Sequence, residues 1–155
     1  MTNDVHWLTR AVELATRSVP AGHGPFGAVV VRDGEVVAEG TNRVTTDTDP
    51  TAHAEVVALR QACARLGVFD LSGAVLYSSC EPCPMCLGAA LWARVDRVVF
   101  AADRDDAARA GFDDRHFHEV LAGRQPSEVP MENLRIDAAL APFEAWHAYP
   151  GRTAY

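Results

Sequence analysis

The chain has 155 residues, 48% of them hydrophobic and 23% charged, which is typical of an ordinary globular domain with a buried core. Its net charge is −7 at pH 7, and all 14 of its Lys and Arg positions hold Arg. Because so acidic a chain lacks the positive field that attracts a phosphate backbone, its charge disfavours a tRNA or DNA substrate. It has no apolar run approaching the ~18 residues of a membrane span and no secretory signal pattern. We therefore expect one cytoplasmic domain over residues 1–155, without a membrane or nucleic-acid partner.

The first half of the chain predicts two helices that flank a hairpin. Apolar residues recur at helical spacing in two stretches, and β-branched residues are concentrated in the two runs between them. The dipeptide Asp33-Gly34 separates these runs and predicts a two-residue hairpin turn. The expected elements are a helix over residues 3–18, strands Gly27–Arg32 and Glu35–Gly40, and a helix over residues 56–66 that ends at Gly67.

The second half predicts a strand–helix–strand unit followed by helical segments. Two strands joined by a helix favour parallel pairing, and helices alternating with strands favour an α/β/α arrangement of three layers. The expected elements are strands Ala74–Ser79 and Val95–Ala102, a helix Pro84–Trp92, helical stretches over residues 103–123 broken at Gly111 and Gly123, a weak strand Asn133–Asp137, and a helix Pro142–Ala148.

Two short stretches hold residues suited to binding a metal: His53-Ala54-Glu55 and Pro82-Cys83-Pro84-Met85-Cys86. One His and two Cys side chains can hold zinc and leave a fourth position open, as in catalytic zinc sites. Cys83 and Cys86 are three residues apart and share one face of a helical turn, whose start the prolines favour. The order His-x-Glu followed by Pro-Cys-x-x-Cys is typical of zinc-dependent deaminases.

Glu55 lies two residues from the expected ligand His53, so both can face one metal only beyond the N-terminal end of a helix. Zinc activates water for attack, and a carboxyl beside it can carry protons. We expect Glu55 to take a proton from the water, deliver it to a ring nitrogen and later protonate departing ammonia. The predicted reaction is hydrolytic removal of an exocyclic amine from an aromatic base.

A structural zinc site made by Cys80, Cys83, Cys86 and His53 is the alternative that these residues leave open. Such a closed site binds no water and has no use for the Glu. Cys63 lies in the second expected helix, and its side chain is expected to pack in the core of the protein. The remaining candidates for a second metal site, His116 and His118, are interpreted as solvated helix residues, and His23 receives no role.

Beyond these motifs, the chain resembles the cytidine-deaminase-fold superfamily along nearly its whole length. The shared stretches are Gly24–Ala28, Asp49–Glu55 and Ser79–Ala89. They are also similar to tRNA adenosine deaminases, so they indicate the superfamily and not the substrate. The narrower resemblance, to bacterial guanine deaminases, lies in Trp92-Ala93-Arg94, Ala110–Asp114, Pro142–Trp146 and Tyr155.

The resemblance implies a three-layer α/β/α cytidine-deaminase-like fold with a five-stranded mixed sheet and one zinc ion per subunit. It implies that His53, Cys83 and Cys86 bind the zinc and that Glu55 is the proton shuttle. It further implies a homodimer with exchanged C-terminal segments, about residues 125–155. In such a dimer Tyr155 would cover the partner's site.

By the same resemblance, further residues meet the base. These are Asn42 and the Ala54 backbone as direct contacts, Phe26 and Trp92 as pocket walls, and Asp114 as a group that recognises guanine or moves its protons. The residues by themselves leave simpler roles open. Asn is common in turns, aromatic side chains are common in cores, an Asp pair can start a helix, and chain ends fray.

Guanine plus water giving xanthine plus ammonia is the reaction we expect. Related substrates stay open: guanosine, ammeline, or another aminated purine, triazine or pyrimidine base. Deamination of adenosine in tRNA is a further alternative, which the net charge of −7 disfavours. A zinc-binding interaction module without catalysis is the remaining alternative, and it predicts four protein ligands.

Overall fold

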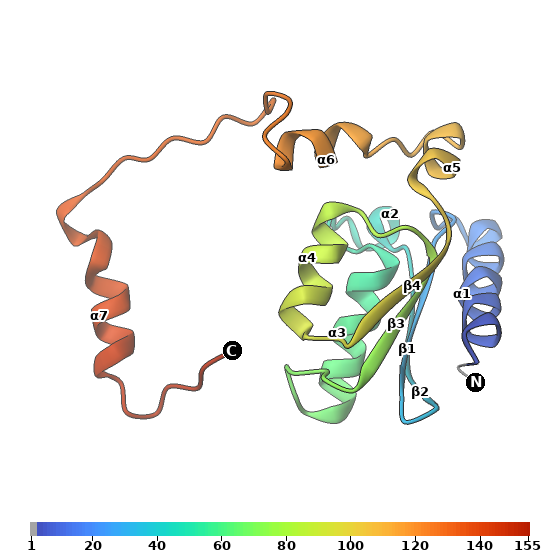
Figure 1. Ribbon diagram of the computed structural model, residues 1–155, viewed down its shortest axis with the longest axis horizontal. Helices are drawn as coiled ribbons and strands as arrows, with labels where there is room; N and C mark the ends of the chain where they lie inside the picture. The colour runs from blue at the N-terminus through green and yellow to red at the C-terminus, as the bar shows by residue number, and fades with distance from the viewer. Residues whose placement is uncertain (1–2) are drawn as a thin grey trace.

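The computed structural model describes residues 3–155, and this part of the chain is built on a mixed sheet with strand order β2-β1-β3-β4 (Figure 1). The strands are β1 (Gly27–Arg32), β2 (Glu35–Thr41), β3 (Ala74–Cys80) and β4 (Arg97–Ala102). The helices are α1 (Asp4–Ser18), α2 (Val44–Asp47), α3 (Ala54–Leu66), α4 (Pro84–Ala93), α5 (Arg104–Arg109), α6 (Arg115–Leu121) and α7 (Ala141–Ala148), with 3₁₀ turns η1 (Val19–Ala21) and η2 (Asp137–Leu140). Within residues 3–155, no helix is both long enough and apolar enough to span a membrane.

The pairing of the strands follows the sequence prediction. β1 pairs antiparallel with both β2 and β3, whereas β3 pairs parallel with β4 across the helix that joins them. In the β1–β2 turn, Asp33 has φ 53° and Gly34 has φ 77°. Positive φ at both central residues is what a type I′ hairpin turn requires, so the predicted hairpin is confirmed.

Helices cover both faces of the sheet, which confirms the predicted three layers. α1 lies on one face, and α3 and α4 lie on the other (Figure 1). Alternate residues of β1 and β3 enter two separate cores, as the period of two in a strand requires. The core under α1 contains Ala11, Val29, Val31 and Tyr77, and the core under α3 and α4 contains Ala28, Val30, Ala58, Ala62 and Leu76.

Two strand glycines let the helices lie close to the sheet. A Cβ on Gly27 would lie 2.7 Å from the backbone nitrogen of Ala15 in α1, and one on Gly40 would lie 2.7 Å from that of Ala58 in α3. Such separations are too short for any side chain. Because β2 and β3 both run antiparallel to β1, their C-terminal ends lie on the same side of the sheet. The helices α3 and α4 begin beside these strand ends.

The expected fifth strand is a wrong prediction, because residues 3–155 form a sheet of four strands. Residues 131–136 have no regular structure, and Asp137–Leu140 is a 3₁₀ turn where the candidate strand Asn133–Asp137 was expected to end. The cause is their position, because this part of the chain lies away from the body of the protein and has no strand edge beside it (Figure 1). The predicted terminal helix is present as α7.

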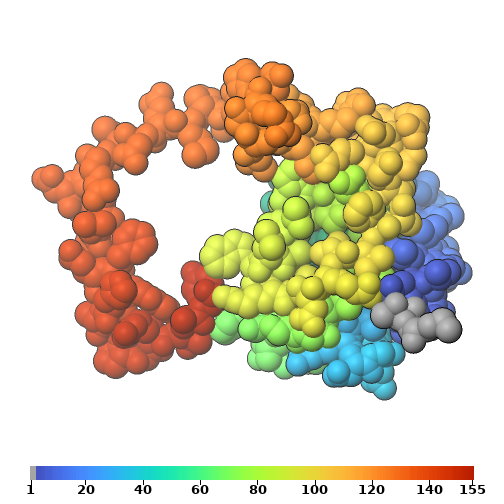
Figure 2. All heavy atoms as spheres, viewed as in Figure 1, coloured from blue at the N-terminus to red at the C-terminus, as the bar shows by residue number. Residues whose placement is uncertain are grey.

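The C-terminal arm, residues 125–155, extends from the body and returns to it at the chain end. Figure 2 shows it as a chain of atoms around an opening. Apart from Ala139, all its residues are exposed. Its exposed large apolar side chains are Val129, Met131, Leu134, Ile136, Leu140, Phe143, Trp146, Tyr149 and Tyr155. So much apolar surface on one short segment indicates an interaction surface.

Candidate metal centre and active site

Three predicted ligands converge where α3 and α4 begin. The Nδ1 atom of His53 lies 3.5 Å from Cys83 Sγ and 3.5 Å from Cys86 Sγ, and the three atoms lie within 4.8 Å of one another. Zinc bonds of about 2.3 Å to sulfur and about 2.0 Å to nitrogen at tetrahedral angles separate a nitrogen and a sulfur ligand by about 3.5 Å. The spacing of these atoms therefore fits a zinc ion with one nitrogen and two sulfur ligands.

A turn before α3 holds His53 at its N-cap. Asp49 Oδ1 accepts hydrogen bonds from the Thr51 nitrogen at 2.8 Å and the Thr51 hydroxyl at 2.7 Å. The His53 nitrogen then donates to the Thr51 carbonyl at 2.8 Å, and His53 has extended backbone angles. The helix therefore begins one residue later, which leaves the imidazole free to point along its N-terminal end. The first turn of α3, starting at Ala54, lies two residues before the predicted start.

The two cysteines occupy the start of α4. Cys83 is its N-cap, and Pro84 stands at the first helical position, where a missing N–H costs least. Cys86 is buried one turn further on. The preceding loop is held by Glu81, whose carboxylate accepts two bonds from the Arg104 guanidinium at 2.6 and 3.1 Å and one from the Arg104 nitrogen at 2.9 Å.

Burial and hydrogen bonds shift the pKa values of the three expected ligands in different directions. A hydrogen bond from Cys86, opposed by burial and assisted by one from His53, lowers the pKa of Cys83 to about 4. The same hydrogen bond, together with burial, raises the pKa of Cys86. The hydrogen bond to Cys83 raises the pKa of His53. A thiolate and a neutral imidazole are the forms that bind metals, so the shift of Cys83 favours zinc, whereas Cys86 and His53 would release a proton when zinc binds.

Glu55 lies beside the ligands in the first turn of α3, with 6% of its surface exposed. Its Oε1 accepts a hydrogen bond from the Ser78 hydroxyl at 3.0 Å, and its Oε2 lies 3.4 Å from Cys86 Sγ. Burial raises the pKa of this carboxyl. A carboxyl that binds a proton more readily than usual, next to a metal site, is suited to general acid–base catalysis near neutral pH.

The alternative four-ligand site is not formed by residues 3–155, where the convergent group is His53, Cys83 and Cys86. The Cys80 thiol donates instead to the Asp103 carbonyl at 3.7 Å. Burial raises the pKa of Cys80 to about 11, which keeps it protonated. Three ligands leave the fourth position of a tetrahedral site open, as catalysis requires.

Residues 1–102 match the cytidine and deoxycytidylate deaminase zinc-binding region. The chain belongs to this zinc-dependent deaminase family. Over 155 residues, and 99% of each chain, this deaminase is 49% identical to a guanine deaminase from Bacillus subtilis. The crystal structure of a guanine deaminase from B. subtilis superposes with a TM-score of 0.93 at 48% identity, covering 100% of this chain and 99% of that one.

A tRNA-specific adenosine deaminase from B. subtilis is 42% identical over 102 residues, which cover 66% of this deaminase and 63% of that protein. A solved guanine deaminase from Nitrosomonas europaea has a TM-score of 0.66 at 38% identity and covers 70% of this chain and 63% of its own. The similarity to the B. subtilis guanine deaminase therefore extends through the C-terminal third, whereas the tRNA-specific relative is similar over about two thirds of the chain.

Three of the expected base contacts lie near the strand ends where the metal centre forms: Asn42, Ala54 and Phe26. Asn42 is buried just after β2, and its Oδ1 accepts a hydrogen bond from the Val44 nitrogen at 3.2 Å. Ala54, fully buried, begins α3. Phe26 packs edge-on against Phe112 with ring centroids 5.0 Å apart and also contacts the core. Asn42 thus has the turn role that its residue type indicates, and Phe26 is partly a core residue.

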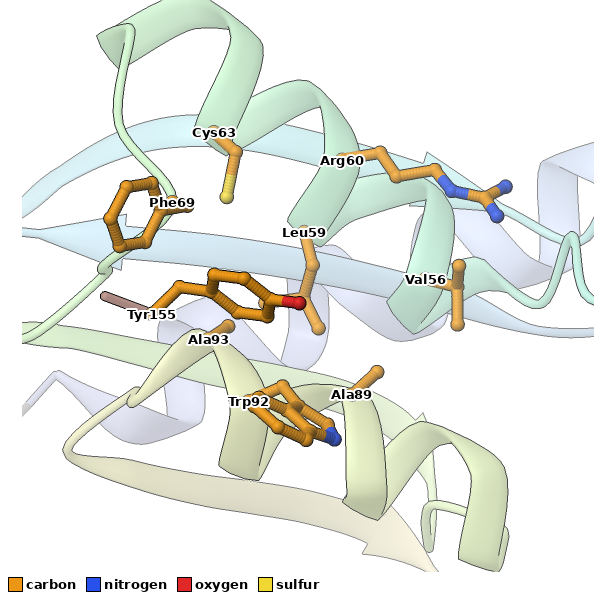
Figure 3. Close-up of a pocket in the computed structure, with 9 residues that line it drawn as sticks. All are labelled: Val56, Leu59, Arg60, Cys63, Phe69, Ala89, Trp92, Ala93 and Tyr155. Atoms are coloured by element: carbon orange, nitrogen blue, oxygen red, sulfur yellow. The ribbon is translucent and has the colours of Figure 1, made fainter. Parts of the chain in front are cut away.

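Trp92 and Tyr155 lie in a groove between α3 and α4. This groove has a volume of about 710 Å³, and none of the expected zinc ligands lines it (Figure 3). The two rings have centroids 6.0 Å apart, and the Tyr155 ring also lies 6.5 Å from that of Phe69. Trp92 is 66% exposed, so within the single chain it is a surface residue and not a core one.

Asp114 precedes α6, and its Oδ2 lies 3.1 Å from Nε2 of His118, one turn further on. The charge of Asp114 also helps to raise the pKa of His53, after the larger contributions of Cys83 and Glu55, whereas burial lowers that pKa. The His118 side chain is 15% exposed, so it is not the solvated residue that the sequence suggested. The Nε2 atom of His116 lies 2.7 Å from Oε1 of Glu128.

Ser78 is the residue of this centre that sequence reasoning missed. It faces the same side of β3 as Leu76 and is 2% exposed. A signal was present, because a hydroxyl at an apolar position of a buried strand requires a hydrogen-bond partner. The identity of that partner depends on how α3 packs across the sheet, which no local pattern specifies.

Proposed function

We propose that this deaminase converts guanine and water to xanthine and ammonia. The main support is the similarity to a guanine deaminase over 99% of both chains, at 49% identity. The convergence of His53, Cys83 and Cys86 beside a buried Glu55 supports the zinc-dependent hydrolysis that this reaction needs. A cytoplasmic location is part of the proposal, because a site built on two thiols is best preserved in a reducing compartment.

His53, Cys83 and Cys86 would hold the zinc ion, which supplies an activated water when bound. Glu55 then carries protons from the water to a ring nitrogen of guanine and to the departing amine. Its Oε2 faces Cys86 and hence the metal position, which suits this role. In the proposal Asn42 and the Ala54 backbone orient the base, Phe26 and Trp92 line its pocket, and Asp114 contacts it.

The active form in this proposal is a homodimer whose C-terminal arms cross to the partner, so that Tyr155 covers the partner's site. Exposed apolar surface supports this exchange. The arm carries large apolar side chains along its length, and α4 adds Leu87, Leu91 and Trp92 to the exposed set. A second copy of the chain carries the same exposed arm and helix, so two copies related by symmetry would cover each other's apolar side chains.

A panel of bases tests the substrate. Ammonia release is measured on guanine, guanosine, ammeline, cytosine and adenine with zinc-loaded protein. We expect kcat/KM on guanine to exceed that on each other base by at least about tenfold, or 1.4 kcal/mol of transition-state binding. Efficient turnover of another base with negligible turnover of guanine would reject the proposed substrate but keep the deaminase chemistry.

A further inference from the structure

Ser78 lies in the middle of the sheet on the face that α3 and α4 cover. Leu76, two residues earlier in β3, belongs to the core on that face, whereas the adjacent Tyr77 belongs to the core under α1. With 2% of its surface exposed, Ser78 is out of reach of bulk solvent. A hydroxyl at such a position is stable only with a protein partner.

That partner is Glu55. The Ser78 Oγ donates to Glu55 Oε1 at 3.0 Å across the gap between β3 and α3. The other oxygen, Oε2, lies 3.4 Å from Sγ of Cys86. The two carboxylate oxygens therefore have different surroundings, one tied to the sheet and one on the side of the expected metal ligands.

We propose that Ser78 is a positioning residue that anchors Glu55 Oε1 so that Oε2 is held toward the metal and the substrate. A carboxylate with one oxygen tied to a rigid strand has lost rotation about its terminal bond. Proton transfer then proceeds through one oxygen in a constant orientation, which is the condition for efficient general acid–base catalysis. This inference rests on the proposed role of Glu55.

The neighbouring Ser79 supplies a matched control. It is also buried in β3, but its Oγ accepts a hydrogen bond from the Gly27 nitrogen at 3.0 Å and so joins β3 to β1. Ser78→Ala and Ser79→Ala remove the same atom one residue apart. A merely structural role for both hydroxyls predicts similar losses of stability and similar kinetics.

A positioning role and a merely structural role are distinguished by kinetics. The substrate used is whichever base the wild-type protein turns over fastest, so the test does not depend on guanine being the substrate. Ser78→Ala should lower kcat by about ten- to a hundredfold with KM within about twofold, since only the orientation of the shuttle changes. Zinc content should stay at one per chain. Ser79→Ala should retain kcat within about threefold, since it does not touch Glu55.

A double-mutant cycle decides whether Ser78 acts through Glu55. In a Glu55→Ala background, Ser78→Ala should lower the remaining turnover less than twofold, because the group it positions is gone. An equal loss of kcat from Ser78→Ala with and without the Glu55 carboxyl would overturn the proposal. Wild-type kcat in Ser78→Ala, or an equal loss of kcat in Ser79→Ala, would overturn it too.

Discussion

Glu55 combines burial with a specific place in the site. Its carboxyl is almost wholly enclosed at the start of α3, next to the expected ligand Cys86. Burial raises its pKa, so it holds a proton at a higher pH than an exposed Glu does. A group that must accept a proton and then release it works best when its pKa is near the working pH.

Glu55→Gln should therefore keep zinc bound and lose turnover. The amide has nearly the same shape and can still accept the Ser78 hydrogen bond, but it cannot carry protons. We expect kcat to fall by about 10²–10⁴-fold, which is the contribution that general acid–base catalysis makes. Metal analysis and ammonia release on the same sample check this. Near-normal turnover would remove Glu55 from its role.

Cys80 ends β3 and Cys83 caps α4 three residues later, and their sulfur atoms have different neighbours. Cys83 Sγ faces His53, whereas Cys80 Sγ faces the Asp103 carbonyl. Cys83→Ala should lose zinc and all measurable activity. Cys80→Ala should keep one zinc per chain and kcat within about threefold, because it removes no ligand. Zinc loss in both variants would restore the four-ligand structural site.

At the scale of elements, the sheet edge and the two helix starts are brought together by close packing of α3 on β2. Gly40 makes this approach possible, because an added Cβ would overlap the Ala54 carbonyl and lie 2.7 Å from the Ala58 nitrogen. Both atoms are helix backbone, so they cannot move independently of the helix. Any movement of α3 would shift His53 and Glu55 together.

Gly40→Ala should destabilise the fold by about 1–3 kcal/mol through overpacking. The displaced helix should also weaken zinc binding. Gly88→Ala in α4 is the control, since an added Cβ there meets nothing within 4 Å. It should raise the free energy of unfolding by about 0.5–1 kcal/mol, because Ala favours the helix more than Gly. Thermal unfolding of both variants measures the contrast, and equal shifts would contradict it.

Tyr77 joins α1 to the sheet and makes this contact sensitive to alkali. Its hydroxyl donates to Asp4 at 2.7 Å, and Arg97 also contacts Asp4 at 2.6 Å. Burial, together with the hydrogen bond and the charge of Asp4, raises the pKa of Tyr77 from 10.0 to about 12. The unfolded chain therefore loses this proton at a lower pH than the folded chain does. The stabilisation that Tyr77 contributes is fully present below pH 10 and is lost as the pH rises toward 12.

Tyr77→Phe should remove that alkaline loss. At pH 8 the variant should be less stable than wild type by about 1 kcal/mol, since it lacks the hydrogen bond to Asp4. The difference should shrink between pH 9.5 and about 11, because only the wild-type protein continues to lose stability there through this group. Urea unfolding at each pH measures it. A difference that does not change with pH would show that Tyr77 does not titrate as argued.

At the scale of the whole molecule, the C-terminal arm is unlike the rest of the chain. Its length and exposure leave its apolar side chains without a core of their own, and its last residue, Tyr155, returns to a groove beside Trp92. Exposed apolar surface of this extent is typical of a segment that contacts a partner. The proposed exchange between two copies supplies that partner and links substrate binding to assembly.

A mixed dimer tests the exchange. A chain ending at Ala148 should keep its zinc and lose about ten- to a hundredfold in kcat/KM, the value of one aromatic side chain buried on substrate. Mixed with Glu55→Gln chains of full length, it should regain activity, because the intact arm then covers a site with an intact Glu55. If the mixture forms dimers in sedimentation but its activity does not exceed the sum of the two chains measured separately, an arm that acts across the interface is excluded.

The two halves of the zinc motif, the hairpin and the order of helices and strands could be predicted from sequence, because each depends on residues close together in the chain. Asp33-Gly34 specifies its turn by backbone preference, and Cys83 and Cys86 share a helix face through their spacing alone. The fifth strand could not be excluded in this way. Residues 133–137 are able to form a strand, but a strand needs an edge to pair with, and the chain carries them away from the sheet.

The tertiary structure decided the relations between distant segments. It brought His53 to the two cysteines, placed Cys80 outside their group, and directed the Ser78 hydroxyl to Glu55. It also placed Trp92 on the surface beside Tyr155. Each of these depends on how α3 packs on the sheet and how α4 lies beside α3. That packing results from the sum of many weak contacts and from the glycines that admit it, so no single motif encodes it.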